Sequence, residues 1–181
     1  MKLLAIQGAL RVESTNRKLL KVAISHLPKG VTTEIYELHD IPFYDGDVEA
    51  KGLPEVVVEF RKKIENADGI LIATPEYNYG VPGVLKNAID WASRPPKQPF
   101  DKKPVVILGA SSGMFGTARA QIQMRLLMQY LNAYAMPRPE FLLGMSAEKF
   151  DSEGNLKDEK SRELLEKFMK AAVEWWERFK S

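Results

Sequence analysis

Short apolar runs alternate with longer amphipathic segments along most of the chain. The run Gly69–Ala73 has no polar position, which is typical of a parallel strand buried on both faces. Residues 2–6 and 105–109 have a similar character, and residues 32–38 and 136–143 are expected to supply a second and a short fifth strand. Strands that alternate with helical segments predict a doubly wound parallel α/β sheet with helices on both faces.

The segments between these runs have helical periodicity. The first expected helix follows the loop 8–17 and ends at about residue 27. The other expected helices cover residues 54–66, 84–93, 116–132 and 158–179, and residues 39–53 are expected to be irregular. The last helix places a set of apolar residues on one face: Leu165, Phe168, Met169, Ala172, Val173 and Trp176. The helix at 116–132 carries apolar residues on more than one face, so we expect it to contact a second partner besides the sheet: Ile122, Met124, Leu126, Leu127, Met128, Tyr130 and Leu131.

Length and composition narrow the class of protein. The 181 residues suit one domain, 1–181, and their formal net charge of +2 does not indicate a nucleic-acid partner. The chain has no cysteine, which excludes disulfides, thiolate metal sites and a cysteine nucleophile. It contains no apolar run near the roughly 20 residues that a membrane helix needs and no recognisable signal peptide. We therefore expect a cytoplasmic protein without membrane insertion.

The loop after the first strand has the residues of an anion site. Gly8 is expected to allow a sharp turn, and Ser14, Thr15 and Asn16 are good residues for the N-terminus of the following helix. Arg11 adds a permanently charged, planar side chain. Loop polar groups and a helix N-terminus suit one phosphate group. The pattern matches neither the dinucleotide fingerprint nor the P-loop. A solvated Arg11 and simple helix capping remain alternative interpretations.

The loop after the third strand is suited to a planar ligand. It contains Pro75, Glu76, Tyr77, Asn78 and Tyr79 at the carboxyl end of a central strand, where open α/β sheets bind their ligands. The tyrosine rings could form a stacking wall or pack as ordinary loop aromatics. The amide of Asn78 suits a pyrimidine edge or turn formation. For Glu76, we expect the backbone to matter more than the charge.

A third loop, after the fourth strand, is expected beside the other two. It contains Ser111 and Gly113, which could contact the same ligand or only form a turn. Arg119 follows on a helix, with a nucleotide contact, a subunit contact or plain solvation as its alternatives. His26 and His39 are far apart in the sequence and have no metal-ligand spacing, so no metal site is expected.

These three loops together resemble the NADPH-dependent FMN reductase family, and the bacterial quinone, chromate and azo-compound reductases in particular. The resemblance spans about residues 2–143 and rests on Gly8-x-x-Arg11-x-x-Ser14-x-Asn16-Arg17, on Pro75-Glu76-Tyr77-Asn78 with the segment 82–91, and on the segment 109–121. One departure is Ala9, where the family usually has Ser. It removes one hydroxyl from the phosphate loop.

The resemblance implies a flavodoxin-like, five-stranded sheet of order 2-1-3-4-5. It also implies FMN as cofactor, with NADPH or NADH as co-substrate and no catalytic side chain, because the flavin carries the chemistry. The residues expected to bind FMN are Ala9, Leu10, Arg11, Ser14, Thr15, Asn16, Pro75, Glu76, Tyr77, Asn78, Tyr79, Ser111 and Gly113.

The expected activity is ping-pong electron transfer to small acceptors such as quinones, chromate, azo or nitro compounds, or free flavin. No second nucleotide motif is present, which favours transient binding of NADPH at the flavin. The resemblance further implies a homodimer, or a dimer of dimers, that packs through the helices after strands three and four. Two alternatives stay open: a flavodoxin-like electron carrier without its own NADPH oxidation, and a flavin-free interaction module.

Overall fold

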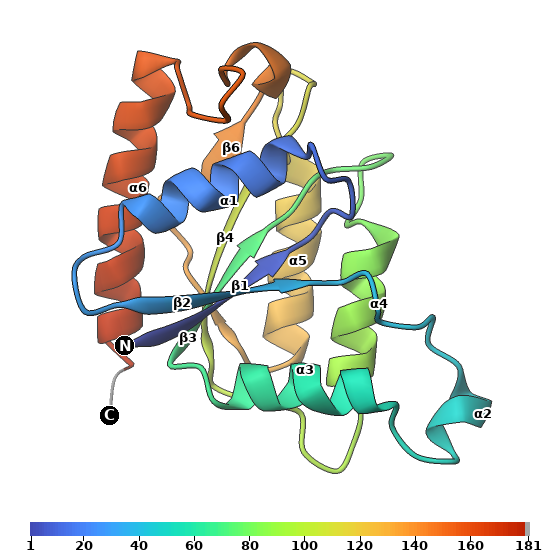
Figure 1. Cartoon of the computed structure of the whole chain (residues 1–181). Helices are drawn as coiled ribbons and strands as arrows, with labels where there is room; N and C mark the ends of the chain where they lie inside the picture. Colours follow the sequence, from blue (N-terminus) through green and yellow to red (C-terminus); the bar gives the residue numbers. More distant parts are fainter. Residues whose placement is uncertain (180–181) are drawn as a thin grey trace.

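A parallel sheet forms the centre of the molecule, and its strands follow the order β2-β1-β3-β4-β5 (Figure 1). The computed structural model describes residues 1–179. A sixth strand pairs with the carboxyl half of β4, beyond the end of β5. The strands are β1 (Lys2–Gln7), β2 (Thr32–Glu37), β3 (Gly69–Ala73), β4 (Pro104–Ala110), β5 (Tyr134–Ala135) and β6 (Phe141–Leu143). The flavodoxin-like order expected from the sequence is confirmed.

Helices cover both faces of this sheet (Figure 1). They are α1 (Thr15–Ser25), α2 (Gly46–Glu49), α3 (Glu55–Glu65), α4 (Gly83–Ala92), α5 (Ala118–Tyr130) and α6 (Glu159–Glu177), with a 3-10 turn η1 at Ser146–Glu148. The residues of α1 and α6 pack into one core cluster, and those of α3, α4 and α5 pack into the other. Alternate residues of β1 divide between the two clusters, as the period of a strand requires.

The structure corrects two expectations about irregular regions. The short strand expected within residues 136–143 is β6, at the end of this range, and a further short strand that was not expected, β5, lies just before it. Pro137 and Pro139 lie between them, and proline has no N–H to donate to a sheet ladder. The segment 39–53, expected to be irregular, contains the four-residue helix α2, which Asp45 caps by accepting a hydrogen bond from the Asp47 N–H.

Two glycines allow close approach at the carboxyl ends of the strands. A Cβ on Gly8 would lie 2.7 Å from the carbonyl oxygen of Ala73, and one on Gly109 would lie 2.3 Å from that of Thr74. Gly8 is outside the left-handed region, so its position does not depend on a backbone conformation that only glycine favours. What the position requires is the absence of a side chain, because β1 and β3 meet there.

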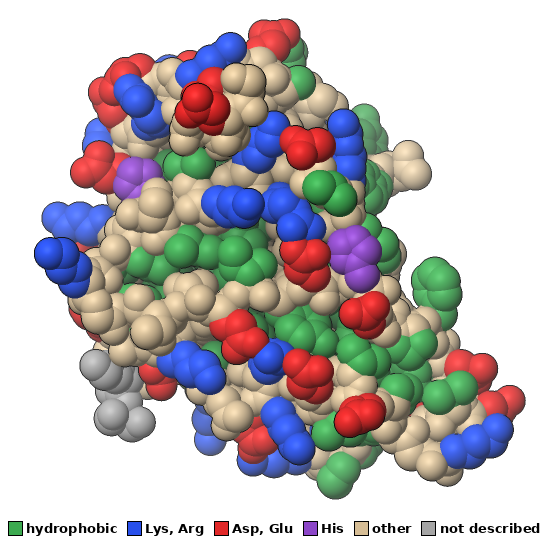
Figure 2. Space-filling view, viewed as in Figure 1, with side chains coloured by type: hydrophobic (Ala, Val, Ile, Leu, Met, Phe, Trp, Pro, Cys, Tyr) green, Lys and Arg blue, Asp and Glu red, His purple; other side chains and the backbone are tan. Residues whose placement is uncertain are grey.

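Acidic and basic side chains are interspersed over the face shown in Figure 2. This agrees with the small net charge of the chain. Within residues 1–179, no helix is both long enough and apolar enough to cross a bilayer.

Candidate functional site

The loops that follow β1, β3, β4 and β6 are joined to one another at the carboxyl edge of the sheet. The Gly8 N–H donates to the Ala73 carbonyl at 2.8 Å, and the Thr74 N–H donates to the Leu108 carbonyl at 3.0 Å. The Ser111 N–H in turn donates to the Leu143 carbonyl at 2.9 Å. The three loops identified in the sequence therefore lie together at this edge of the sheet.

The N-terminus of α1 presents free donors toward this edge. Ser14 is the N-cap residue, and its hydroxyl accepts a hydrogen bond from the Asn16 N–H at 3.2 Å. The first N–H groups of a helix have no partner inside it. Within residues 1–179, the N–H groups of Thr15 and Arg17 have no acceptor. Such an arrangement suits an anion, so binding of the ligand phosphate at this helix end stays a prediction.

Two arginines near this helix end have different surroundings. Arg11 is exposed and forms no ion pair with any of the residues 1–179. Arg17 donates a hydrogen bond to the Glu37 carboxylate, which lowers the pKa of that carboxyl group below its ordinary value. Arg11 is therefore the arginine of this loop that remains available to a ligand.

Asn16 joins the first loop to β4. Its side chain is buried, its Nδ2 donates to the Ala110 carbonyl at 2.8 Å, and its Oδ1 accepts from the Ala110 N–H at 2.8 Å. The sequence assigned this side chain to the ligand phosphate, whereas the structure uses both of its polar atoms to bind the backbone of a distant strand. Direct binding of phosphate by Asn16 therefore stays a prediction, and the Ala110 backbone competes with the phosphate for the same side chain.

The loop after β3 forms a tight hairpin. The Tyr77 N–H donates to the Gly80 carbonyl at 3.2 Å, and the Gly80 N–H donates to the Tyr77 carbonyl at 2.9 Å. Between them, Asn78 and Tyr79 have φ angles of 50° and 64°. Two consecutive residues with positive φ are typical of a type I′ turn. The turn-forming interpretation of Asn78 thus applies, and the rings of Tyr77 and Tyr79 are more than half exposed.

Glu76 uses its carboxylate inside the protein. Its side chain is only 8% exposed, and its Oε2 accepts hydrogen bonds from the N–H groups of Arg119 at 2.9 Å and Ala120 at 3.0 Å. The Arg119 guanidinium lies 3.9 Å from the centroid of the Tyr79 ring. Sequence analysis missed this function because the partners of Glu76 lie more than 40 residues away.

The loop after β6 is a part of the site that the sequence did not identify. The Met145 N–H donates to the Gly113 carbonyl at 3.1 Å, and the Ser146 N–H donates to the Ser111 carbonyl at 3.0 Å. The Ser146 hydroxyl also lies 3.4 Å from that of Thr15. Met145 has a φ of 51°, which marks a tight turn. A methionine with a left-handed backbone conformation cannot be recognised from a single sequence.

The other predicted residues occupy both the interior and the surface of this edge. Ala9 and Pro75 are buried, Leu10 and Ser111 are half-buried, and Gly113 is exposed. Gln7, the last residue of β1, was also missed. It is buried, and neither polar atom of its side chain has a partner within residues 1–179.

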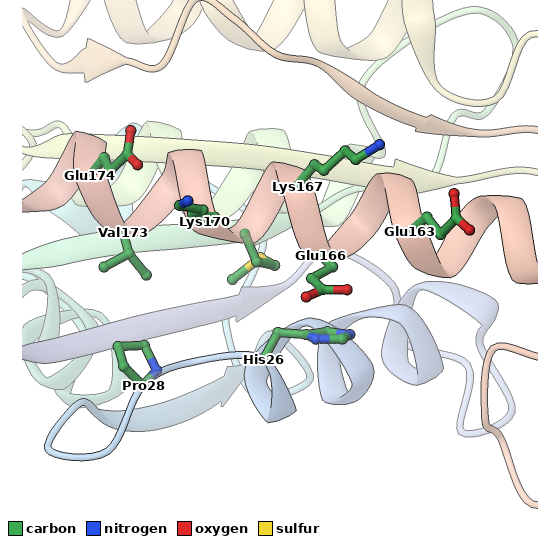
Figure 3. A pocket seen from close by; sticks show the side chains of 9 residues that line it. His26, Pro28, Glu163, Glu166, Lys167, Lys170, Val173 and Glu174 are labelled. Carbon is green, nitrogen blue, oxygen red and sulfur yellow. The ribbon is translucent and has the colours of Figure 1, made fainter.

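A groove of about 650 Å³ lies elsewhere, between the end of α1 and the side of α6. His26 and Pro28 face the side chains of α6 across it (Figure 3). Because α1 ends toward the amino edge of the sheet, this groove is separate from the joined loops and presents no helix N-terminus. His26 and His39 are both exposed, and residues 1–179 contain no group of three or more His, Asp or Glu side chains placed to hold a metal ion.

Comparison with known proteins identifies the family. Residues 1–148 match the family described as NADPH-dependent FMN reductase. The chain is 47% identical to an NAD(P)H-dependent FMN reductase of Pseudomonas aeruginosa, over 99% of this chain and 97% of that protein. It is 42% identical to a quinone reductase of Escherichia coli, over 83% and 81% of the two chains.

A solved structure agrees over the whole chain. The flavoenzyme FerB of Paracoccus denitrificans, an NAD(P)H:acceptor oxidoreductase, superimposes with a TM-score of 0.90 at 34% identity and covers 98% of both chains. The chain therefore belongs to the NADPH-dependent FMN reductase family, with FMN as its cofactor and NAD(P)H as its co-substrate.

Proposed function

We propose that this protein accepts a hydride from NADPH or NADH at a bound FMN and passes the electrons to a small acceptor. The observation that carries this proposal is the meeting of a helix N-terminus with free donors and a pre-formed turn at one edge of the sheet. When bound, FMN supplies the hydride and electron transfer chemistry. The protein then has to bind, orient and shield this group.

The residues present fit the phosphate of FMN. The N–H groups at the start of α1 and the exposed guanidinium of Arg11 are donors suited to one phosphate. We assign Arg11, Ser14 and Thr15 to its binding, with main-chain groups of Ala9 and Leu10 beside them. The unpaired amide of Gln7 lies at the start of the same loop. Asn16 acts by holding this loop against Ala110.

The residues of the second loop fit a flavin ring. We assign Pro75–Tyr79 to the ring, with main-chain N–H groups of the hairpin at its polar edge, and Ser111 and Gly113 to its border. Fixed N–H dipoles stabilise negative charge without reorganisation when that charge develops. A turn that is already closed in the free protein would supply such dipoles.

The acceptor is proposed to be a quinone, because the relatives in Escherichia coli and a Burkholderia species are named quinone reductase and 2-hydroxy-1,4-benzoquinone reductase. Chromate, azo or nitro compounds and free flavin are further candidates on the resemblance alone. We also propose a cytoplasmic location, since NAD(P)H is the electron donor.

Ping-pong kinetics are the expected result of one shared binding face. If the nicotinamide must leave before the acceptor binds, initial rates at several fixed quinone concentrations give parallel double-reciprocal lines. The measurement follows NADPH oxidation with benzoquinone under anaerobic conditions. Intersecting lines would show that donor and acceptor are bound together, and the shared-face arrangement would be abandoned.

A homodimer is proposed from the outer face of α5. Ile122, Leu126 and Tyr130 are spaced four residues apart and are 59%, 61% and 87% exposed. Residues at this spacing form one stripe on a helix, and two-fold association is the commonest way to cover such a stripe. A dimer of dimers would form by a further two-fold association of this kind.

Leu126→Glu should convert the dimer to a monomer near the 20.5 kDa mass of one chain, as measured by light scattering at micromolar concentration. The matched control is Leu164→Glu, which places the same charge at an exposed leucine of α6, on the other side of the sheet. A monomeric wild-type protein with full NADPH oxidation would contradict the proposal.

A further inference from the structure

The Tyr77–Gly80 hairpin is held in a conformation that its own sequence does not favour. Asn78 tolerates the left-handed region, but a tyrosine there costs about 1–2 kcal/mol. Tyr79 nevertheless has a φ of 64°. Strain of this kind persists only where the surroundings determine the conformation. The contacts of this loop with α5 therefore have to maintain the strained conformation of the turn.

Gln123 forms hydrogen bonds with the backbone in the second half of the hairpin. Its Nε2 donates to the Tyr79 carbonyl at 3.0 Å, and its Oε1 accepts from the Val81 N–H at 3.2 Å. The two backbone groups lie on either side of Gly80. One amide side chain thus satisfies a donor and an acceptor of the turn, and it fixes the turn to the first half of α5.

Glu76 ties the first half of the hairpin to the same helix. Thr117, the N-cap residue of α5, makes no capping bond through its side chain, and Glu76 supplies the carboxylate instead. A negative charge at this end of a helix is also favoured by the helix dipole. The second oxygen, Oε1, lies 3.5 Å from Nη1 of Arg119, whose guanidinium covers the Tyr79 ring.

We propose that Glu76 and Gln123 are positioning residues that keep the Tyr77–Gly80 turn closed, so that its remaining main-chain N–H groups, those of Asn78 and Tyr79, are in place before FMN binds. The inference rests on the proposed assignment of this loop to the flavin ring. Neither side chain needs to touch the cofactor. Their contribution is to remove the cost of ordering the loop on binding, which otherwise subtracts from affinity.

Glu76→Ala should raise the Kd of the apoprotein for FMN about tenfold or more, because both tying bonds at the start of α5 are lost. Glu76→Gln should stay within about threefold of the wild type, because one amide oxygen can accept both N–H groups in place of Oε2. Gln123→Ala should raise the Kd about threefold or more through the other tie. Fluorescence titration of each apoprotein with FMN, well below its unfolding temperature, measures these values.

The matched control is Asp158→Ala. Asp158 caps α6 by accepting the Ser161 N–H at 3.0 Å, so its loss weakens a helix N-terminus without touching the hairpin. Its Kd for FMN should equal that of the wild type. An equal loss of affinity in this control would mean that general destabilisation, and not positioning, explains the effect.

The remaining outcomes separate this inference from the proposed function. A wild-type apoprotein that binds no FMN would contradict the proposed function itself. A wild type that binds FMN while Glu76→Ala and Gln123→Ala bind equally well would contradict only the positioning of the turn. Equal weakening by Glu76→Ala and Glu76→Gln would also contradict it. If Glu76→Ala does not fold, the exposed Gln123→Ala decides, and an unchanged Kd overturns the inference.

Discussion

Asn16→Ala is expected to lower the free energy of unfolding by about 2–4 kcal/mol, because it leaves the N–H and the carbonyl of Ala110 without partners in a buried place. The first loop would also lose its connection to β4, so the affinity for FMN should fall with the stability. Urea unfolding of the apoprotein gives the first quantity, and titration with FMN gives the second.

Asn87→Ala is the matched control for this change. Asn87 makes the same pair of amide hydrogen bonds with the backbone, accepting from the Tyr44 N–H and donating to the Pro42 carbonyl, both at 2.8 Å. These bonds are solvent-exposed, so water replaces them, and the loss should be about 1 kcal/mol or less. Equal losses in the two variants would contradict the structural importance assigned to Asn16.

Arg11→Ala is expected to raise the Kd for FMN about tenfold or more without changing the free energy of unfolding. The expected factor follows from one charge-assisted hydrogen bond to phosphate, worth about 1.5–3 kcal/mol. Stability should not change, because Arg11 is exposed and forms no ion pair within residues 1–179. Fluorescence titration of the apoprotein with FMN measures the Kd.

Lys21→Ala controls for the general effect of a positive charge on α1. It removes an exposed cation on the same helix, about two turns from the N-terminus. Its Kd for FMN should remain within about twofold of the wild type at 0.15 M salt, where exposed charges this far apart are largely screened. An Arg11 variant that binds FMN like the wild type would remove Arg11 from the phosphate site.

The alternation of strands and helices was predictable because its evidence is local, whereas the strand order was expected only from the family resemblance. Gly69–Ala73 is apolar at every position, and the helices on either side have a clear periodicity. The additional short strand β5, just before β6, was not predicted. The two prolines between them were visible, but which part of β4 each short piece joins depends on tertiary packing.

The position of the three loops at one edge of the sheet was predictable, but the connections between them were not. Asn16 meets Ala110, and Glu76 meets the start of α5, across separations of 94 and more than 40 residues. A side chain that suits a ligand in chemical terms is equally suited to a distant backbone group. The sequence shows the capacity of Asn16 and Glu76 to form hydrogen bonds, and only the fold decides their partners.

The most direct test of the central claim is anaerobic stopped-flow mixing of the FMN-loaded protein with NADPH, with no second protein present. The proposed function predicts that the absorbance of the bound flavin is bleached at least as fast as steady-state turnover, and that it returns when benzoquinone is then added. If the flavin is reduced only when a separate reductase is supplied, the protein is an electron carrier and not an NAD(P)H-dependent reductase.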